Sequence, residues 1–121
     1  LQGRGRVFIV GYCYGGTTVW KAAAQLEGLA AASAYYGSGV AAATNLEPKC
    51  PIICHFGRKD AHIPADEVKA KLAAAHPDVP IYIYEHSGHG FNNDGRPDSN
   101  ADDARLARRR TLELFEQNLR A

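Results

Sequence analysis

The chain has 121 residues, of which 45% are hydrophobic, so it is long enough to bury the core of one ordinary domain. Its 14 Lys and Arg residues nearly balance its 13 Asp and Glu residues, and a net charge of +1 gives no overall field favouring nucleic acid or an anionic membrane. We expect no signal segment or membrane span, because no long apolar run occurs, and the expected ligand is a small molecule.

The three cysteines, Cys13, Cys50 and Cys54, are odd in number and lack the spacing of a disulfide framework. This pattern favours a reducing, cytoplasmic location. Cys50 and Cys54 could supply half of a zinc site. However, Cys54 lies within an apolar run and no second ligand pair follows, so we expect no metal.

The first half of the chain predicts alternating strands and helices. Val7–Val10 is a short apolar run rich in β-branched residues, which predicts a strand buried on both faces. Thr17–Leu26 has apolar residues at helical spacing, which predicts a helix. Two further strands are predicted over Leu29–Tyr36 and Pro51–Phe56.

The second half continues the alternation. A helix is predicted over Pro64–Ala75, a strand over Ile81–Tyr84 and a long amphipathic helix over Ala101–Leu119. The basic run Arg108–Arg110 is interpreted as a solvated face of this last helix. Its expected buried side consists of Leu106, Leu112, Phe115 and Leu119.

Strands that alternate with helices predict an α/β fold, with about four mostly parallel strands and flanking helices in a single domain over residues 1–121. In such sheets, ligands bind at the carboxyl ends of the strands. The residues with candidate chemistry all follow predicted strands.

The sequence GYCYG places Cys13 at the centre of a predicted strand-to-helix turn. Glycines permit a tight turn, the amino end of the helix stabilises a thiolate, and the backbone N–H of Tyr14 can donate to an oxyanion. A plainer interpretation makes Cys13 a small core residue.

An acid and a histidine follow the next strands. Asp60 ends the sequence GRKD after the third strand, and His89 is the centre of SGHGF after the fourth. Taken singly, Asp60 could cap a helix and His89 could be a turn residue. Together they follow the cysteine in the nucleophile, acid, histidine order of α/β hydrolases.

The segments GYCYGG, AYYGSG, FGRKDAHIP and SGHGF resemble the carboxyl-terminal half of the dienelactone hydrolase (carboxymethylenebutenolidase) family over essentially the whole chain. The resemblance implies an α/β hydrolase that opens enol-lactones with Cys13 as nucleophile, His89 as base and Asp60 orienting the base. It implies a thioester intermediate and requires no metal or organic cofactor. Candidate substrate-contacting residues are Tyr36, His62 and Phe91, although each of them could simply pack.

The resemblance also implies that the chain supplies only the last four strands of an eight-stranded sheet, and the absence of methionine suggests a fragment. A second oxyanion donor, an acidic residue near the nucleophile and a substrate-binding arginine would belong to the other half. The Val7–Val10 strand would then present a free apolar edge, and we expect it to pair with a second copy of the chain.

Three alternatives stay open to different degrees. The chain could be an inactive or weakly active half-domain that binds a ligand or self-assembles. A serine esterase is disfavoured because cysteine occupies the nucleophile position, and a redox role is disfavoured because no C-x-x-C sequence occurs.

Overall fold

The computed structural model describes residues 6–91 and 100–119, and the elements alternate as the sequence predicts. The strands are β1 (Val7–Tyr12), β2 (Leu29–Tyr35), β3 (Ile52–Gly57) and β4 (Ile81–Tyr84). The helices are α1 (Tyr14–Gln25), α2 (Ala65–Ala75), α3 (Ala101–Gln117) and the 3₁₀ turn η1 (Ala41–Ala43).

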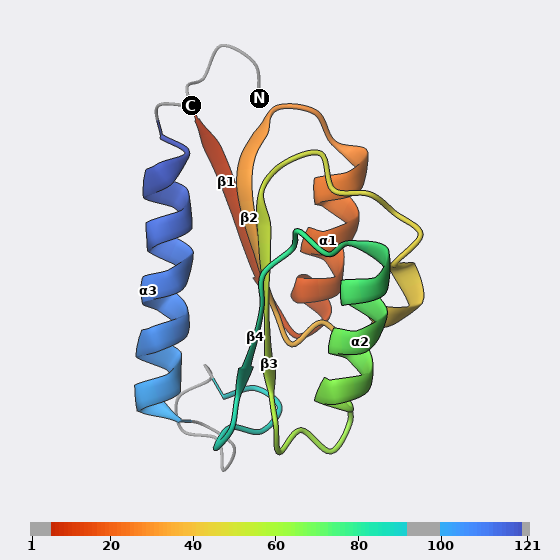
Figure 1. The fold of residues 1–121 in the computed structure, drawn as a ribbon. Coiled ribbons are helices and arrows are strands. Elements are labelled where there is room, and N and C mark those ends of the chain that lie inside the picture. Colours follow the sequence, from red (N-terminus) through yellow and green to blue (C-terminus); the bar gives the residue numbers. More distant parts are fainter. Residues whose placement is uncertain (1–5, 92–99, 120–121) are drawn as a thin grey trace.

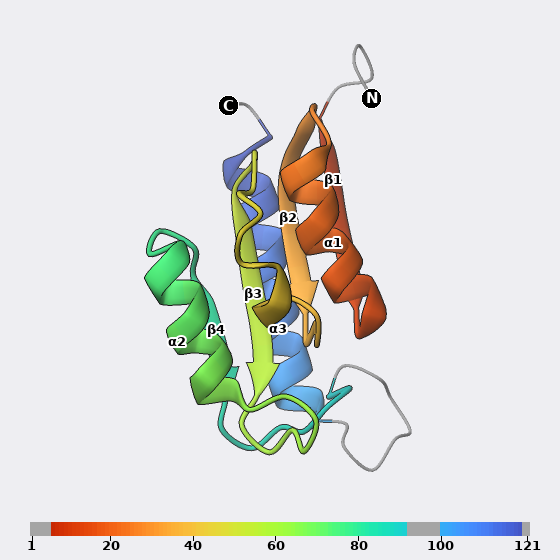
Figure 2. The ribbon, with the colours of Figure 1, turned by 90° about the vertical axis from the view of Figure 1, so that its right-hand side faces the viewer.

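The strands form one sheet in the order β1-β2-β3-β4, and every neighbouring pair is parallel. The register pairs Tyr12 with Tyr35 and Gly57 with Tyr84 at the carboxyl ends. This edge of the sheet lies at the bottom of Figures 1 and 2, so the segments that follow the strands meet there. The predicted four-stranded α/β fold is confirmed.

The helices cover both faces of the sheet, with α3 on one face and α1 and α2 on the other (Figure 1). The core on the α1 and α2 side includes Trp20 and Leu72, both fully buried. The indole Nε1 of Trp20 donates to the carbonyl of Ala43 at 2.8 Å, which ties α1 to η1. The two-sided cover accounts for the near-continuous apolar character of β2 and β3.

The expectation that Val7–Val10 is buried on both faces is wrong. Residues Val7 to Ile9 are only partly buried, and Val10 is 41% exposed. The physical reason is position: β1 is the outer strand of the sheet, and within residues 6–91 and 100–119 it pairs only with β2.

The expected buried side of the last helix is also partly wrong. Leu112 and Leu119 are half exposed, whereas Ala107 and Thr111 are buried. Arg110, expected in solvent with its neighbours, lies over the ring of Tyr82 with 4.1 Å between the guanidinium carbon and the ring centroid. The face of α3 that meets the sheet is thus set by small and hydroxyl-bearing residues. Leu106 packs against the core as expected, and the ring of Phe115 stacks on that of Phe8.

Candidate active site

Cys13 occupies a sharp turn between β1 and α1. Its backbone has φ 56° and ψ −121°, in a region that residues with a side chain rarely adopt. The turn is held because the Cys13 N–H donates to the Tyr35 carbonyl at 3.1 Å and the Cys13 carbonyl accepts from Gly16 N–H at 2.9 Å. Such a conformation costs about 1–3 kcal/mol and is typical of nucleophile turns.

The glycines around Cys13 differ in what they permit. A Cβ on Gly11 would lie 2.2 Å from the Gly15 carbonyl oxygen, and one on Gly16 would lie 2.3 Å from the Tyr35 carbonyl oxygen. A Cβ on Gly15 would meet no atom of the described residues within 4 Å. Both glycines of GYCYG were expected to permit the tight turn, but close contacts require a glycine only at Gly11 and not at Gly15.

Tyr14, the proposed oxyanion donor, is the first residue of α1. Backbone N–H groups in the first turn of a helix have no partner within that helix and carry partial positive charge. The Tyr14 side chain is 83% exposed, so only its backbone is fixed by the turn.

Asp60 and His89 meet at the carboxyl edge of the sheet. Asp60 Oδ2 lies 2.7 Å from His89 Nδ1, and Asp60 Oδ1 accepts from the backbone N–H groups of His62 at 2.8 Å and Ile63 at 3.0 Å. The Asp60 side chain is 1% exposed and that of His89 is 24% exposed. A carboxylate held at Nδ1 directs Nε2 of the imidazole to act as a base.

Backbone and side-chain contacts tie the turns that carry this pair. Lys59 N–H donates to the Ser87 carbonyl at 2.9 Å, and the buried Ser87 hydroxyl donates to Asp103 Oδ2 at 2.6 Å. On the surface, Arg58 bonds Glu85 through two nitrogens and also pairs with Asp66. These supporting contacts could not be predicted, because nothing in the sequence pattern identifies which polar residues pair.

The other predicted site residues lie near His89 in different ways. The rings of Tyr36 and His62 lie 5.3 Å and 5.6 Å from the His89 ring, measured between centroids. Phe91 is fully buried and packs against Tyr36 and Tyr84. Contact of Tyr36, His62 or Phe91 with substrate stays a prediction.

A second cluster combines histidine with hydroxyl groups. His55 Nε2 lies 3.0 Å from Ser33 Oγ and 3.3 Å from Thr111 Oγ1, and His55 Nδ1 lies 2.8 Å from the Tyr84 hydroxyl. The cluster lies between β2, β3, β4 and α3, and His55 and Ser33 are fully buried. It is sealed from substrate and has a structural role.

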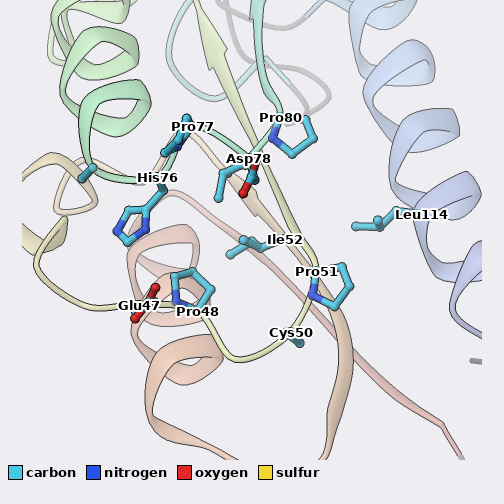
Figure 3. Close-up of a pocket in the computed structure, with 12 residues that line it drawn as sticks. Glu47, Pro48, Cys50, Pro51, Ile52, His76, Pro77, Asp78, Pro80 and Leu114 are labelled. Atoms are coloured by element: carbon cyan, nitrogen blue, oxygen red, sulfur yellow. The ribbon is translucent and has the colours of Figure 1, made fainter.

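Another cavity lies at the opposite, amino edge of the strands (Figure 3). Its volume is about 440 Å³, and its walls include Pro48, Cys50, Pro77 and Leu114. It contains none of the predicted site residues, so we place the candidate chemistry at Cys13, Asp60 and His89 instead.

Within residues 6–91 and 100–119, no group of three or more His, Cys, Asp or Glu side chains is arranged to hold a metal ion. In the same part of the chain, no helix is long and apolar enough to cross a membrane.

Comparison with known sequences points to one family. The sequence model of the dienelactone hydrolase family matches residues 2–119. A Yersinia pestis protein named "Putative carboxymethylenebutenolidase" is 36% identical over 93% of this chain and 47% of its own length. The carboxymethylenebutenolidase of Pseudomonas putida is 32% identical over 92% of this chain and 48% of its own. The chain spans about half the length of these relatives.

Solved structures agree. A Klebsiella pneumoniae crystal structure titled as a "Putative Dienelactone Hydrolase" superposes with a TM-score of 0.76 at 31% identity, over 91% of this chain and 51% of that one. An esterase of Pyrococcus furiosus superposes with a TM-score of 0.68 at 12% identity, over 94% of this chain and 53% of that one. The second likeness shows the fold alone.

Proposed function

The chain belongs to the dienelactone hydrolase family, and we propose that it hydrolyses a lactone or small carboxylic ester with Cys13, His89 and Asp60 as its triad. The observation that carries the proposal is the 2.7 Å contact between His89 Nδ1 and the buried Asp60 carboxylate, at the same sheet edge as the strained Cys13 turn. No metal or organic cofactor is required.

The proposed reaction is acyl transfer in two stages. Cys13 thiolate attacks the carbonyl carbon, and the oxyanion accepts a hydrogen bond from the Tyr14 N–H. The bond from carbon to the leaving oxygen breaks, and that oxygen takes a proton from His89. A water molecule then gives a proton to His89 and attacks the thioester, which releases the acid and restores the thiolate. Asp60 stabilises the imidazolium in both stages.

The direct test is the pH dependence of Cys13 alkylation by iodoacetamide, followed at each cysteine by mass spectrometry. We expect Cys13 to react fast well below about pH 8.5, where a free thiol ionises, and to slow in His89→Ala. His86→Ala is the matched control, since His86 is an exposed histidine outside the site. Cys50 supplies an internal reference, because burial raises the pKa of its thiol.

Turnover is tested in parallel on a simple enol-lactone and an aryl ester, with Cys13→Ser as the nucleophile variant and Cys50→Ser as its control. Hydrolysis that persists in Cys50→Ser and disappears in Cys13→Ser supports the proposal. If Cys13 alkylates like an ordinary thiol and neither substrate is consumed, the proposal is wrong. The chain would then be the ligand-binding or self-assembling half-domain of the alternative interpretation.

A second proposal concerns association and stands apart from catalysis. We propose that β1 pairs through its outer edge with β1 of a second copy. What supports it is a group of exposed apolar side chains on this strand and just after it: Val10, Tyr12 and Tyr14. Light scattering on protein eluting from a size-exclusion column tests this pairing. A monomer at every concentration would exclude it.

A further inference from the structure

A small cavity of about 170 Å³ lies beside the Asp60–His89 pair. Its walls come from the segment after β2, the segment after β3 and the first turns of α2. His62 joins it to the candidate active site, because His62 lines the cavity while its ring meets the His89 ring edge-on. Ser38, which also lines the cavity, comes two residues after Tyr36, and the ring of Tyr36 contacts that of His89. The cavity is thus on the His89 side of the site.

The inner wall of the cavity is aliphatic. Ile63 and Val68 are 2% and 4% exposed, and Ala41 is partly buried. At the rim, Glu67 and Lys71 lie one turn apart on α2 with opposite charges. A rim with balanced charge gives no preference for an ion, whereas the aliphatic wall favours an uncharged group.

Hydrogen bonds fix both walls before any ligand arrives. The backbone N–H groups of His62 and Ile63 are held by Asp60 Oδ1, so the wall and the candidate acid move together. Gly39 N–H donates to Thr17 Oγ1 at 2.9 Å, which anchors the loop that carries Ser38 to the first turns of α1. A preformed wall loses little freedom on binding.

We propose that this cavity is the leaving-group subsite of the hydrolase and takes an uncharged aliphatic group on the alcohol side of the ester. The inference rests on the proposed function, in which His89 gives its proton to the leaving oxygen and so has that part of the substrate beside it. A water molecule takes about 30 Å³ in the liquid, so 170 Å³ holds roughly five or six non-hydrogen atoms.

The kinetic test uses acetate esters whose alcohol runs from methyl to octyl, followed by acid release at constant pH. We expect kcat/KM to rise about two- to fourfold for each methylene up to about pentyl and then to level off. Ala41→Leu and, as a second variant, Ser38→Leu fill the cavity and flatten the series. Ala70→Leu, on the exposed side of α2, leaves it unchanged. Ethyl esters of lengthening acids show no effect of Ala41→Leu.

A binding test is independent of turnover. In ¹H–¹⁵N NMR spectra, titration with 1-pentanol should shift the amides of Ile63 and Val68 in the wild type and not in Ala41→Leu. If esters are hydrolysed but kcat/KM does not change with the length of the alcohol, the proposed subsite is wrong and the proposed function stands. If no ester is hydrolysed, the proposed function fails, and the titration alone decides whether the cavity binds aliphatic groups; unshifted amides overturn that as well.

Discussion

Acid should destabilise this fold through the buried histidine of β3. Both ring nitrogens of His55 have hydroxyl partners, Nε2 with Ser33 and Thr111 and Nδ1 with Tyr84. A neutral imidazole can satisfy all of these hydroxyl partners, and none of them is a carboxylate that would stabilise a protonated ring. Burial, and secondarily the Arg110 guanidinium, lower the pKa of His55 from 6.5 to about 3.

The sign and size of the effect follow from this pKa. In the unfolded chain the imidazole binds a proton below about pH 6.5, whereas in the folded chain His55 stays neutral until about pH 3. Its contribution to stability is therefore complete above pH 6.5 and is lost as the pH falls towards 3. At about 1.4 kcal/mol per pH unit, the free energy of unfolding drops by about 2.5 kcal/mol between pH 7 and pH 4.5.

Urea unfolding at pH 7 and pH 4.5 measures this loss in the wild type, in His55→Gln and in the control His86→Gln. Glutamine does not titrate, so we expect the wild type and His86→Gln to lose about 2.5 kcal/mol more than His55→Gln over this range. Carboxylates protonate in all three proteins and cancel in the comparison. An equal acid loss in His55→Gln and the wild type would refute the reasoning.

Three further perturbations test other parts of the structure. Gly11→Ala should lower the free energy of unfolding, measured by urea unfolding, by several kcal/mol, whereas Gly15→Ala should leave it unchanged or raise it by up to about 1 kcal/mol. Equal effects of the two substitutions would contradict the contacts at the turn. Asp60→Asn should lower kcat for ester hydrolysis by about 10²- to 10⁴-fold with the fold intact by circular dichroism, and unchanged turnover would remove Asp60 from the triad. Val10→Lys should reduce the mass found by light scattering to that of a monomer, while Lys49→Ala, a surface control, should not; a wild type that is already monomeric excludes the pairing.

The fold was predictable because local signals agree with the global pattern. The short apolar runs at Leu29–Tyr36 and Ile81–Tyr84 each begin directly after a glycine or a proline, and the structure places strands there with end points that differ by at most one residue. The first helix begins three residues earlier than expected, at Tyr14 instead of Thr17. The reason is that the sharp turn after β1 places Cys13 itself at the amino end of the helix, with no intervening loop.

The contacts of α3 were beyond prediction because they depend on what the sheet presents to it. Hydrophobicity alone selects Leu112, yet the position facing the buried hydroxyl of Ser33 is Thr111, at 2.8 Å. Likewise, a run of arginines predicts a solvated face, but the rings of Tyr82 and Tyr84 give Arg110 an aromatic surface to cover. Which side chains of α3 face the sheet is therefore determined by residues of β2 and β4.

A comparison of His55 with His89 shows why the position of a residue relative to the strand ends predicted the candidate site better than its residue type did. His55 has serine, threonine and tyrosine partners, a set that by composition alone suggests catalysis, but its side chain lies inside a strand and under α3. His89 follows the end of β4, is partly exposed and faces a carboxylate. Parallel pairing brings every strand end to one edge, so chemistry that follows strands converges there, while chemistry within strands is covered by helices. A histidine, serine and threonine cluster in the interior is thus a stabilising network, and the residues of the proposed triad all lie just past the strand ends.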